Sequence, residues 1–291
     1  FSYTPTSLTT GSTFGWSRAA VGGITEGASS GSGAINETLT NTTSAPIAVT
    51  YVIVTSANSC SNTPGQNVVV VVEPVPSVVN PGNQVLCAGA STTAIDFVTT
   101  GVGTQYNWTN TNSTIGLPLS GSGNIASFTA VNTGTAPVTA TITVTPVYNG
   151  CTGSNQVFTI TVNPIPVLST TLTPGAICSG TAFSYTPTSS TTGATFAWSR
   201  AAVAGISEGA SSGAVSINET LTNTTATPIN VTYVVVTSAN GCSNAGQNVV
   251  VTVNPIPVLS STLTPAAICS GATFSYTPTS LTTGSTFGWS R

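Results

Sequence analysis

Residues 165–255 contain four short runs in which apolar and polar residues alternate. The runs cover residues 182–188, 195–200, 229–237 and 247–253. Alternation with a period of two predicts β-strands, because successive side chains of a strand point to opposite faces. Turn sequences such as Ser-Ser-Gly, Asn-Gly and Thr-Pro separate the runs, and no stretch shows the period of a helix. A unit of this length with about seven short strands is typical of an antiparallel β-sandwich.

The pattern repeats along the chain with a period of 91 residues. Cysteines mark the period in two series, each advancing by 91 residues: Cys60, Cys151 and Cys242, and Cys87, Cys178 and Cys269. Residues 1–18 are identical to residues 274–291. Fixed-period similarity is the sequence signature of array proteins. We therefore predict an all-β tandem array of sandwiches, and we expect the chain to be a window from a longer array.

Pairs of prolines two positions apart mark the predicted domain boundaries. They lie in residues 73–76, 163–166 and 254–257. Such prolines keep the chain extended and remove hydrogen-bond donors, so a strand should end there and the next domain begin. The predicted domains are residues 1–74, which lack the first strand, 75–164, a diverged copy, 165–255, the complete repeat, and 256–291, the start of the next repeat.

Charged residues are rare, which limits the possible partners. Only 3% of the 291 residues are charged, the net charge is −3, and the sequence contains no His, Lys or Met. Three Arg residues cannot neutralise a phosphate backbone, which argues against nucleic-acid binding. The longest apolar stretch, residues 67–79, contains Glu73 and two prolines and is too short for a membrane span.

Five sequence motifs of the third repeat resemble a known family. They are Ile-Cys-Ser-Gly, Thr-Phe-Ala-Trp-Ser-Arg, Ile-Asn-Glu-Thr-Leu-Thr-Asn-Thr-Thr, Val-Thr-Tyr-Val-Val-Val-Thr and Asn-Gly-Cys-Ser-Asn. The motifs resemble the PKD-like and Ig-like tandem domains of very large Bacteroidota cell-surface proteins, including gliding-motility adhesins exported by type IX secretion. The acidic Trp-Asp-Phe-Gly-Asp-Gly motif of typical PKD domains is missing, since Ser199 and Arg200 follow Trp198. A calcium site built from carboxylates is therefore not expected.

Six cysteines in a chain without His predict disulfides rather than a metal site or another cofactor. Disulfides imply an oxidising, extracellular or cell-surface location. One possible pairing lies within each repeat and joins Cys87 to Cys151 and Cys178 to Cys242, with the partners of Cys60 and Cys269 outside the sequence. In an Ig-like topology, however, these two positions lie at opposite ends of a sandwich. The other pairing is a staple across a domain junction, from Cys87 to Cys242.

Two further groups of residues are candidate sites. Trp16, Trp108, Trp198 and Trp289 are candidates either for stacking on sugars or for the core tryptophan of an Ig-like sandwich, and their alternating neighbours favour the core. Ion-pair candidates occur in the first and third repeats: Arg18 with Glu26 and Glu37, and Arg200 with Glu208 and Glu219. The second repeat lacks both Arg and Glu at these positions. An exposed pair of this kind contributes at most about 1 kcal/mol.

Other chemistry has weaker support in the sequence. The paired Glu residues could form a glycosidase-like pair, but hydroxyl nucleophiles lack a His or Lys partner, so we predict no enzyme. Asn-x-Ser/Thr triplets could carry glycans in a eukaryotic secreted protein, whereas in a bacterial protein we expect ordinary strand and turn residues. The triplets begin at Asn36, Asn41, Asn107, Asn112, Asn218, Asn223 and Asn230.

The sequence predicts a structural, non-catalytic repeat segment of a long extracellular surface fibre or adhesin shaft. The expected partners are further copies of the same repeat, which associate into a fibre, and surface glycans are a second candidate. Two alternatives stay open. One is an array of carbohydrate-binding or other ligand-binding modules, and the other is a spacer in a secreted enzyme.

Overall fold

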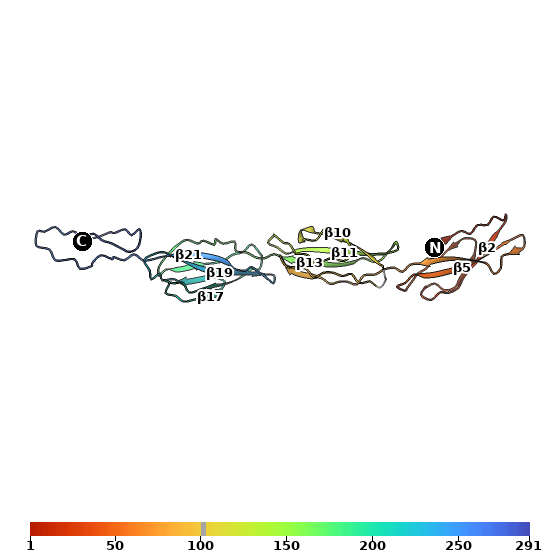
Figure 1. Cartoon of the computed structure of the whole chain (residues 1–291), viewed down its shortest axis with the longest axis horizontal. Coiled ribbons are helices and arrows are strands. Elements are labelled where there is room, and N and C mark those ends of the chain that lie inside the picture. The colour runs from red at the N-terminus through yellow and green to blue at the C-terminus, as the bar shows by residue number, and fades with distance from the viewer. Residues whose placement is uncertain (100–102) are drawn as a thin grey trace. The chain divides into compact units, whose positions relative to one another are not determined.

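The computed structural model describes residues 1–99 and 103–291 of the chain. Over these residues the secondary structure is β-strand, apart from one short 3-10 turn, η1 (Ser113–Ile115) (Figure 1). The chain divides into two compact units. One consists of Phe1–Val85, Ala90–Ala130 and Thr139–Thr161, and the other of Leu86–Gly89, Val131–Val138 and Val162–Arg291. Three successive repeats form β-sandwiches, so the predicted all-β fold is confirmed.

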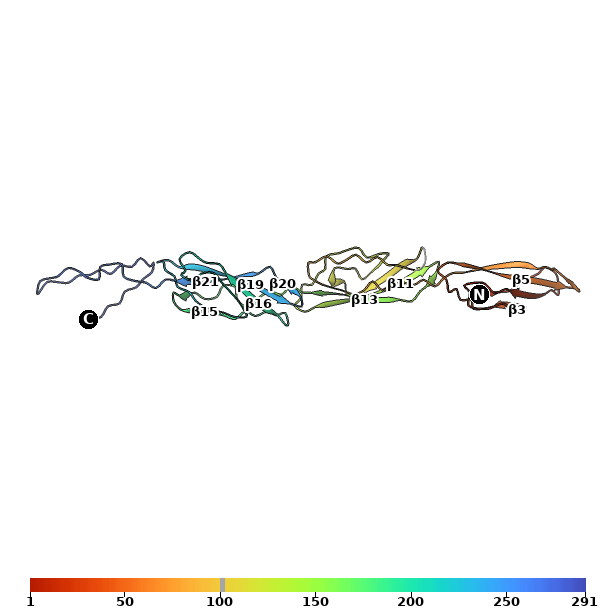
Figure 2. The same ribbon diagram turned by 90° about the horizontal axis from the view of Figure 1, so that it is seen from below.

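The third repeat is the most complete sandwich. One sheet has the strand order β14-β21-β19-β16-β17, with β20 paired to β19, and the second sheet is the pair β15-β18. The strands are β14 (Ile177–Cys178), β15 (Ala182–Tyr185), β16 (Thr195–Arg200), β17 (Ser211–Ala214), β18 (Ile217–Thr220), β19 (Ile229–Ala239), β20 (Cys242–Ser243) and β21 (Gln247–Asn254). Figure 2 shows β16, β19 and β21 as neighbours. All four predicted strands of this repeat are confirmed, although the first ends earlier, at Tyr185.

The core of this sandwich lies between its two sheets. Phe183 of β15 stacks on Tyr233 of β19 with ring centroids 5.3 Å apart, and Trp198 of β16 meets the same ring edge-on at 5.7 Å. Tyr233 and Val251 are fully buried. The apolar face that alternation predicted along β19 and β21 is therefore the face that packs inward.

A glycine on the edge strand lies opposite the tryptophan in each sandwich. Trp198 pairs with Gly213 across β16 and β17, and a Cβ atom on Gly213 would lie 2.7 Å from the indole ring. Trp16 with Gly31 and Trp108 with Gly121 repeat this arrangement. The indole ring packs directly on the backbone of the glycine. A side chain at this position would collide with the ring, so the edge strand requires glycine here.

The first repeat has the same two sheets but a less closed core. Its larger sheet has the order β3-β2-β5-β6, with β7 paired to β5, and its smaller sheet is β1-β4. The strands are β1 (Ser2–Tyr3), β2 (Thr13–Arg18), β3 (Ser29–Ser32), β4 (Ile35–Asn36), β5 (Ile47–Ala57), β6 (Cys60–Ser61) and β7 (Gln66–Val72). Ile35, Val49 and Tyr51 are fully buried, whereas Val68 and Val70 of β7 are only partly buried.

The second repeat keeps the large sheet and loosens the small one. Its order is β10-β9-β11-β13-β8, with β12 paired to β11. The strands are β8 (Gln84–Cys87), β9 (Gln105–Asn110), β10 (Ser120–Ser122), β11 (Val138–Tyr148), β12 (Cys151–Thr152) and β13 (Gln156–Asn163). In place of a two-stranded sheet, the isolated bridges Ser91–Thr129 and Ile95–Ile125 hold the opposite layer.

Residues 256–291 contain no named strand. Their backbone is held by the isolated bridge between Leu259 and Ser280 and by a hydrogen bond of 2.7 Å from the N–H of Ser260 to the carbonyl oxygen of Thr279. Among the described residues, no helix is long and apolar enough to cross a membrane.

The burial pattern makes a direct prediction for β19 and β21. Val251→Ala removes two methyl groups from a fully buried site and should destabilise the third sandwich by about 2 kcal/mol. Val234→Ala, on the outward face of β19 at 37% exposure, is the matched control and should have a much smaller effect. Hydrogen exchange of the β19 amides in the full chain measures both. Equal effects would contradict the assignment of the inner face.

Candidate functional site

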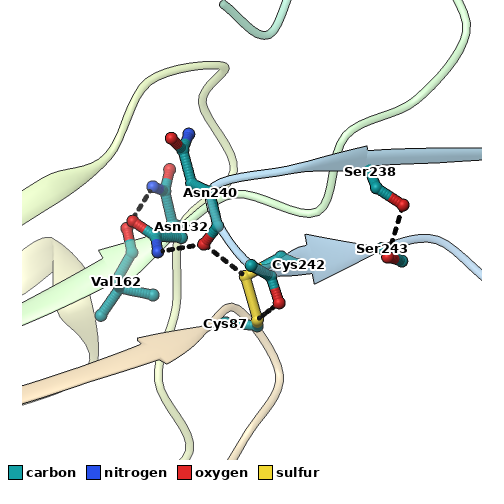
Figure 3. The surroundings of a disulfide bond; sticks show 9 residues. Cys87, Asn132, Val162, Ser238, Asn240, Cys242 and Ser243 are labelled. Carbon is teal, nitrogen blue, oxygen red and sulfur yellow. Dashed lines mark hydrogen bonds between the residues drawn. A yellow bond between two sulfur atoms is a disulfide. The ribbon is translucent and has the colours of Figure 1, made fainter. Parts of the chain in front are cut away.

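One disulfide joins two successive repeats. Cys87 is the last residue of β8 in the second repeat, and Cys242 opens β20 in the third repeat. Their Sγ atoms lie 1.99 Å apart and their Cα atoms 5.7 Å apart, within the range that a disulfide needs. Both residues belong to the same compact unit. Figure 3 shows the bond beside the hairpin that connects β19 to β20.

The turn between β19 and β20 presents Cys242 to β8. Asn240 and Gly241 have φ angles of 52° and 77°, which is typical of an Asn-Gly hairpin turn. The side chain of Asn163 donates to the carbonyl oxygen of Asn240 at 2.8 Å. The N–H of Ala88 donates to the carbonyl oxygen of Asn163, also at 2.8 Å. Cys242 is 2% exposed, so the bond lies in a packed and hydrogen-bonded junction.

The pairing within a repeat, from Cys87 to Cys151 and from Cys178 to Cys242, is not the one that the structure contains. Cys151 and Cys178 have free thiols. The physical reason is the length of the sandwich. Cys178 pairs with Asn254 at the end of β21, whereas Cys242 precedes the start of β21, so the two cysteines of one repeat lie at opposite ends. The staple across the junction brings together ends that are close.

The spacing of the disulfide explains why one such bond is present. Cys87 and Cys242 are 155 residues apart. The same step taken forward from Cys178 or Cys269, or backward from Cys60 or Cys151, leads outside residues 1–291. The other four, which have free thiols, are Cys60, Cys151, Cys178 and Cys269. By the 91-residue period, each occupies one of the two positions that are bonded in the Cys87–Cys242 pair.

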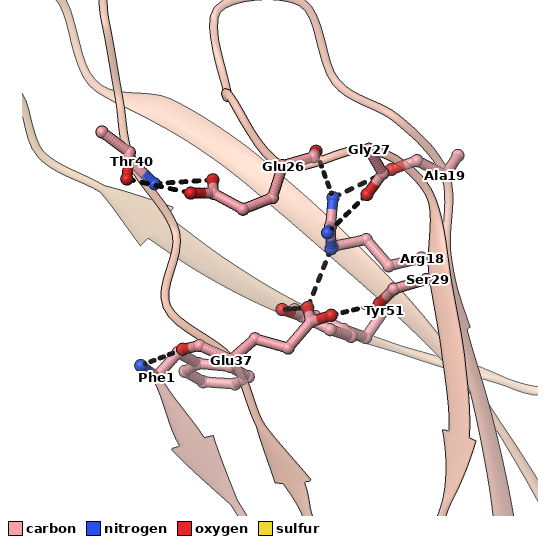
Figure 4. Close-up of polar contacts among 9 residues, drawn as sticks. All are labelled: Phe1, Arg18, Ala19, Glu26, Gly27, Ser29, Glu37, Thr40 and Tyr51. Atoms are coloured by element: carbon pink, nitrogen blue, oxygen red, sulfur yellow. Dashed lines mark hydrogen bonds and ion pairs between the residues drawn. The ribbon is translucent and has the colours of Figure 1, made fainter.

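A buried arginine ties together the two sheets of the first sandwich. Arg18, at the end of β2, is 3% exposed, and its Nε donates to Glu37 at 2.9 Å (Figure 4). Its remaining nitrogens donate to backbone oxygens of the loop before β3, including that of Gly27 at 2.7 Å. Tyr51 of β5 donates its hydroxyl to Glu37 at 2.5 Å, and Ser29 donates to the same carboxylate. The ion pair is therefore part of a network, not an exposed surface contact.

The third sandwich contains the same network. Arg200 donates to Glu219 at 2.9 Å, Tyr233 donates to Glu219 at 2.5 Å, and the guanidinium lies 5.9 Å from the Tyr233 ring centroid. Glu208 does not pair with the arginine through its carboxylate. It accepts from the N–H of Thr222 at 2.8 Å, and its backbone oxygen accepts from Arg200. Glu26 has the same role in the first sandwich, where it accepts from Thr40.

The second sandwich replaces the whole network. Asn110 occupies the arginine position, because it pairs with Ile142 as Arg200 pairs with Tyr233. Asn110 is 5% exposed and donates to the carbonyl oxygen of Leu117 at 2.9 Å. A neutral amide thus holds the loop, and an apolar Ile142 replaces the tyrosine that would bind a carboxylate. Tyr51 and Tyr233 are the members that sequence analysis missed, and their loss together with Arg and Glu in the second repeat is the signal that identifies them.

Burial and hydrogen bonding shift the pKa values of this network. Desolvation and the Glu37 carboxylate raise the pKa of Tyr51 to about 12, so its hydroxyl stays a proton donor. Burial opposes ionisation of Glu37 and Glu219, but hydrogen bonds from their tyrosine and arginine partners outweigh it and lower the pKa of both carboxyls. The N–H of Thr222 lowers the pKa of Glu208 to about 2. All of these carboxyls are ionised at neutral pH.

One asparagine in each repeat clamps the end of a strand. Asn223 is 7% exposed, and its side-chain amide donates to the carbonyl oxygen of Val253 at 2.9 Å and to that of Thr227 at 2.8 Å. Asn41 and Asn132 make the corresponding bonds in the other two repeats. Asn41 and Asn223 begin predicted Asn-x-Thr triplets. Their amide nitrogens are already used in the fold, so these two positions serve structure rather than glycan attachment.

The tryptophans divide by how completely their repeat is folded. Trp108 is 7% and Trp198 9% exposed, as expected for core residues, and Trp16 is partly buried. Trp289, in the partial repeat of residues 256–291, is 89% exposed, and its place in the core of a complete repeat stays a prediction. The described residues 256–291 contain no counterpart of β19 for this side chain to pack against.

The described residues contain no cluster of three or more His, Cys, Asp or Glu side chains that could hold a metal. The carboxylates of Glu208 and Glu219, the possible glycosidase-like pair, already accept hydrogen bonds from residues of their own sandwich. Arg200 and Tyr233 bind Glu219, while Thr222 and Ser207 bind Glu208. Each carboxylate is therefore held by groups of its own domain and kept ionised, which suits a structural role and does not suit a general acid.

The repeats match a protein family. A family model described as PKD-like domain matches residues 1–76 and 175–257, which is more than half of the chain. The chain belongs to this PKD-like domain family. No curated protein matches the sequence.

Solved structures of tandem domains are similar to the chain. A structure of three immunoglobulin domains of titin is 10% identical and has a TM-score of 0.44, and the match covers 85% of this chain and 89% of that one. A segment of mouse cadherin-23 is 13% identical and has a TM-score of 0.33, and the match covers 84% and 86%. At these identities the likeness concerns the fold alone.

The second repeat suggests a test of the buried network. Arg200→Asn alone leaves the partly buried Glu219 without its cation and should destabilise the third sandwich by about 3 kcal/mol. A triple variant with the residues of the second repeat, Arg200→Asn, Glu219→Phe and Tyr233→Ile, should recover more than half of that loss. Hydrogen exchange of the β19 amides reports both values. A triple variant less stable than the single one would show that the network is not exchangeable as a unit.

The lowered pKa of Glu219 predicts a pH dependence. The folded state holds the carboxyl ionised below its ordinary pKa of 4.5, so its stabilisation is complete above that value and is lost as the pH falls through the folded pKa. The third sandwich should lose stability below about pH 4.5, and Glu219→Gln should flatten this loss. The second sandwich, which lacks the network, is the internal control. Equal acid sensitivity of the two sandwiches would contradict the prediction.

Proposed function

We propose that the chain is a load-bearing segment of a long extracellular fibre or adhesin shaft. The observation that carries the proposal is the Cys87–Cys242 disulfide, which joins successive sandwiches covalently. A binding module needs an exposed site within one domain, whereas a bond between domains serves to resist their separation. The disulfide also stabilises the fold by restricting the unfolded chain, typically by about 2–4 kcal/mol.

The bond changes how the chain carries tension. A pull on the two ends reaches Cys87, crosses the disulfide and continues from Cys242. The residues between the two cysteines then carry no tension, and their unfolding cannot lengthen the chain. Free cysteines at the same two repeat positions would extend this protection if further copies of the repeat supply their partners.

The disulfide supports a location for the protein, and the sequence motifs support an origin. A disulfide supports an oxidising, extracellular setting. The motifs that resemble tandem domains of large Bacteroidota surface proteins support attachment to a bacterial surface after type IX export. The expected partners are further copies of the repeat, since a surface with few charges permits close lateral packing without repulsion.

Carbohydrate binding through the tryptophans has less support. A sugar would stack on an exposed aromatic face, but Trp108 and Trp198 are less than 10% exposed and lie opposite glycines that their indole rings cover. Surface glycans therefore remain the weaker candidate partner.

Electron microscopy of the native material, with the length of the parent polypeptide measured in the same sample, tests the proposal. Long uniform fibres with a bead repeat of roughly 30–40 Å, the height of one sandwich, are the expected result. Short particles that do not assemble would overturn the proposal and favour a ligand-binding module or an enzyme spacer.

Single-molecule stretching tests the mechanical role of the disulfide. Without reductant, the residues between Cys87 and Cys242 should add no length when the sandwiches unfold. With reductant, unfolding of this span, 155 residues in separation, should release about 500 Å more chain. The double variant Cys87→Ser with Cys242→Ser should behave as the reduced chain under both conditions. The same released length with and without reductant would show that the bond does not carry load.

A further inference from the structure

The larger sheet of the third sandwich has a free edge at β17, which Figure 1 shows at the margin of the sandwich. Among the described strands, β17 pairs with β16 alone. Ser212, Gly213 and Ala214 are exposed, and the whole strand lies in one compact unit. The strands β3 and β10 have the same outer position in the larger sheets of the other two sandwiches. The free edge is therefore a property of the repeat.

Two residues of β17 direct their backbone groups to this edge. β16 and β17 form an antiparallel ladder, and the N–H of Val215 donates to the carbonyl oxygen of Phe196 at 3.1 Å. Residues that bond to the neighbouring strand alternate in such a ladder. Ser212 and Ala214 therefore direct their N–H and C=O groups away from β16. An edge with unpaired groups of this kind accepts a further strand.

The usual devices that protect a sheet edge are missing from β17. Proteins block such edges with charged side chains, prolines or bulges. Residues 209–218 contain no charged residue and no proline, and β17 pairs with β16 without a bulge. The carboxylates on either side, Glu208 and Glu219, accept hydrogen bonds from Thr222 and Arg200 of the same sandwich. Only the shortness of β17, which has four residues, limits pairing.

A valine in an unfavourable backbone conformation follows this strand. Val215 has a φ angle of 67°, in the left-handed region that a β-branched residue seldom adopts. In the other two sandwiches the equivalent N–H bonds come from Gly33 and Gly123, whose φ angles are 75° and 71°. Glycine adopts this conformation without strain. The side chain of Val215 is 63% exposed, so it contributes little to the core of its own sandwich.

The strain at Val215 and the free edge of β17 are separate observations at one place. A strained residue persists where another interaction compensates for its cost. The third sandwich leaves the methyl groups of Val215 in solvent, whereas a partner strand at the edge would cover them. Both observations therefore point to a partner that binds along β17.

We propose that β17 pairs in antiparallel orientation with β17 of a second copy of this chain. With Gly213 opposite Gly213 of the second copy, Ser212 of each copy lies opposite Ala214 of the other. Their N–H and C=O groups then form about four hydrogen bonds across the two-fold axis. The two larger sheets become one continuous sheet. Val215 of each copy lies beside Ser211 of the other and loses part of its exposure.

A second copy fits this edge better than another strand does. Two identical edges related by a two-fold axis are self-complementary, because each donor of one meets an acceptor of the other. The small residues of β17 allow close approach, and no charge in residues 209–218 repels the second copy. The inference deepens the proposed function, because it names the strand through which chains associate laterally, and it rests on that function for its biological use.

Sedimentation of the full chain over a range of concentrations, combined with hydrogen exchange, tests the inference. The chain should associate reversibly. Exchange at the Ser212 and Ala214 amides should slow by about tenfold or more as the concentration rises. The free edge of β10, with Ser120 and Ser122 and with Gly123 in place of the valine, is the internal control. Exchange at these two serine amides should not depend on concentration.

Three variants identify the strand that associates. Ser212→Pro removes an outward N–H and should abolish the association, and proline is tolerated where the N–H of an edge strand faces solvent. Exchange of the β19 amides checks that the sandwich stays folded. Ser120→Pro is the matched control on β10 and should leave the association unchanged. Val215→Gly relieves the strain and removes the side chain, so it should weaken the association about tenfold without destabilising the sandwich.

A chain that stays monomeric, equal protection of β10 and β17, or association that Val215→Gly leaves unchanged would overturn the inference. These results are separable from those on the fibre. Fibres in the native material without association through β17 would remove this contact and keep the proposed function. Association through β17 without fibres would keep the contact and remove the proposed function.

Discussion

Every sandwich in this chain depends on covering the apolar face of its two long strands. In the third sandwich Tyr233 lies at the centre of that face. It is fully buried and contacts Phe183 from the opposite sheet, Trp198 from the neighbouring strand and the carboxylate of Glu219. Each of these groups comes from a different part of the repeat, so covering the face brings the whole repeat together.

The chain has few charged residues, and it buries two of its three arginines. Arg18 and Arg200 are each 3% exposed and connect a strand, a loop and the opposite sheet through one side chain. The neutral side-chain amides of Asn110 and Asn223 have a comparable role. In each, one nitrogen donates hydrogen bonds to two or more backbone carbonyl oxygens. Because a buried ion pair is costly to desolvate, an amide is a workable substitute, and the second repeat uses it.

The junction between the second and third repeats uses both covalent and hydrogen-bonded contacts. The disulfide joins a strand end to a hairpin turn, and the Asn163 side chain binds the same turn. The first junction has a related contact, from Asn149 of a hairpin to Glu73 at 3.2 Å. If a hairpin of each repeat contacts the end of the preceding repeat, the same kind of junction can recur along an array of any length. This property suits the shaft of a fibre more than it suits an enzyme.

The sequence by itself determined the all-β sandwich, its 91-residue period and the inward face of the long strands. These properties are local: alternation sets the face of a strand, and proline and Asn-Gly pairs set where strands end. It also identified Arg18, Glu37, Arg200 and Glu219, because Arg and Glu vary together between repeats.

Only the tertiary structure decided which groups meet. Cys242 pairs with Cys87 rather than Cys178 because a sandwich places its own two cysteines at opposite ends. Tyr233 joins the ion pair because neighbouring strands set it beside Arg200. Such contacts depend on residues far apart in the chain, and a period or a pattern does not specify them.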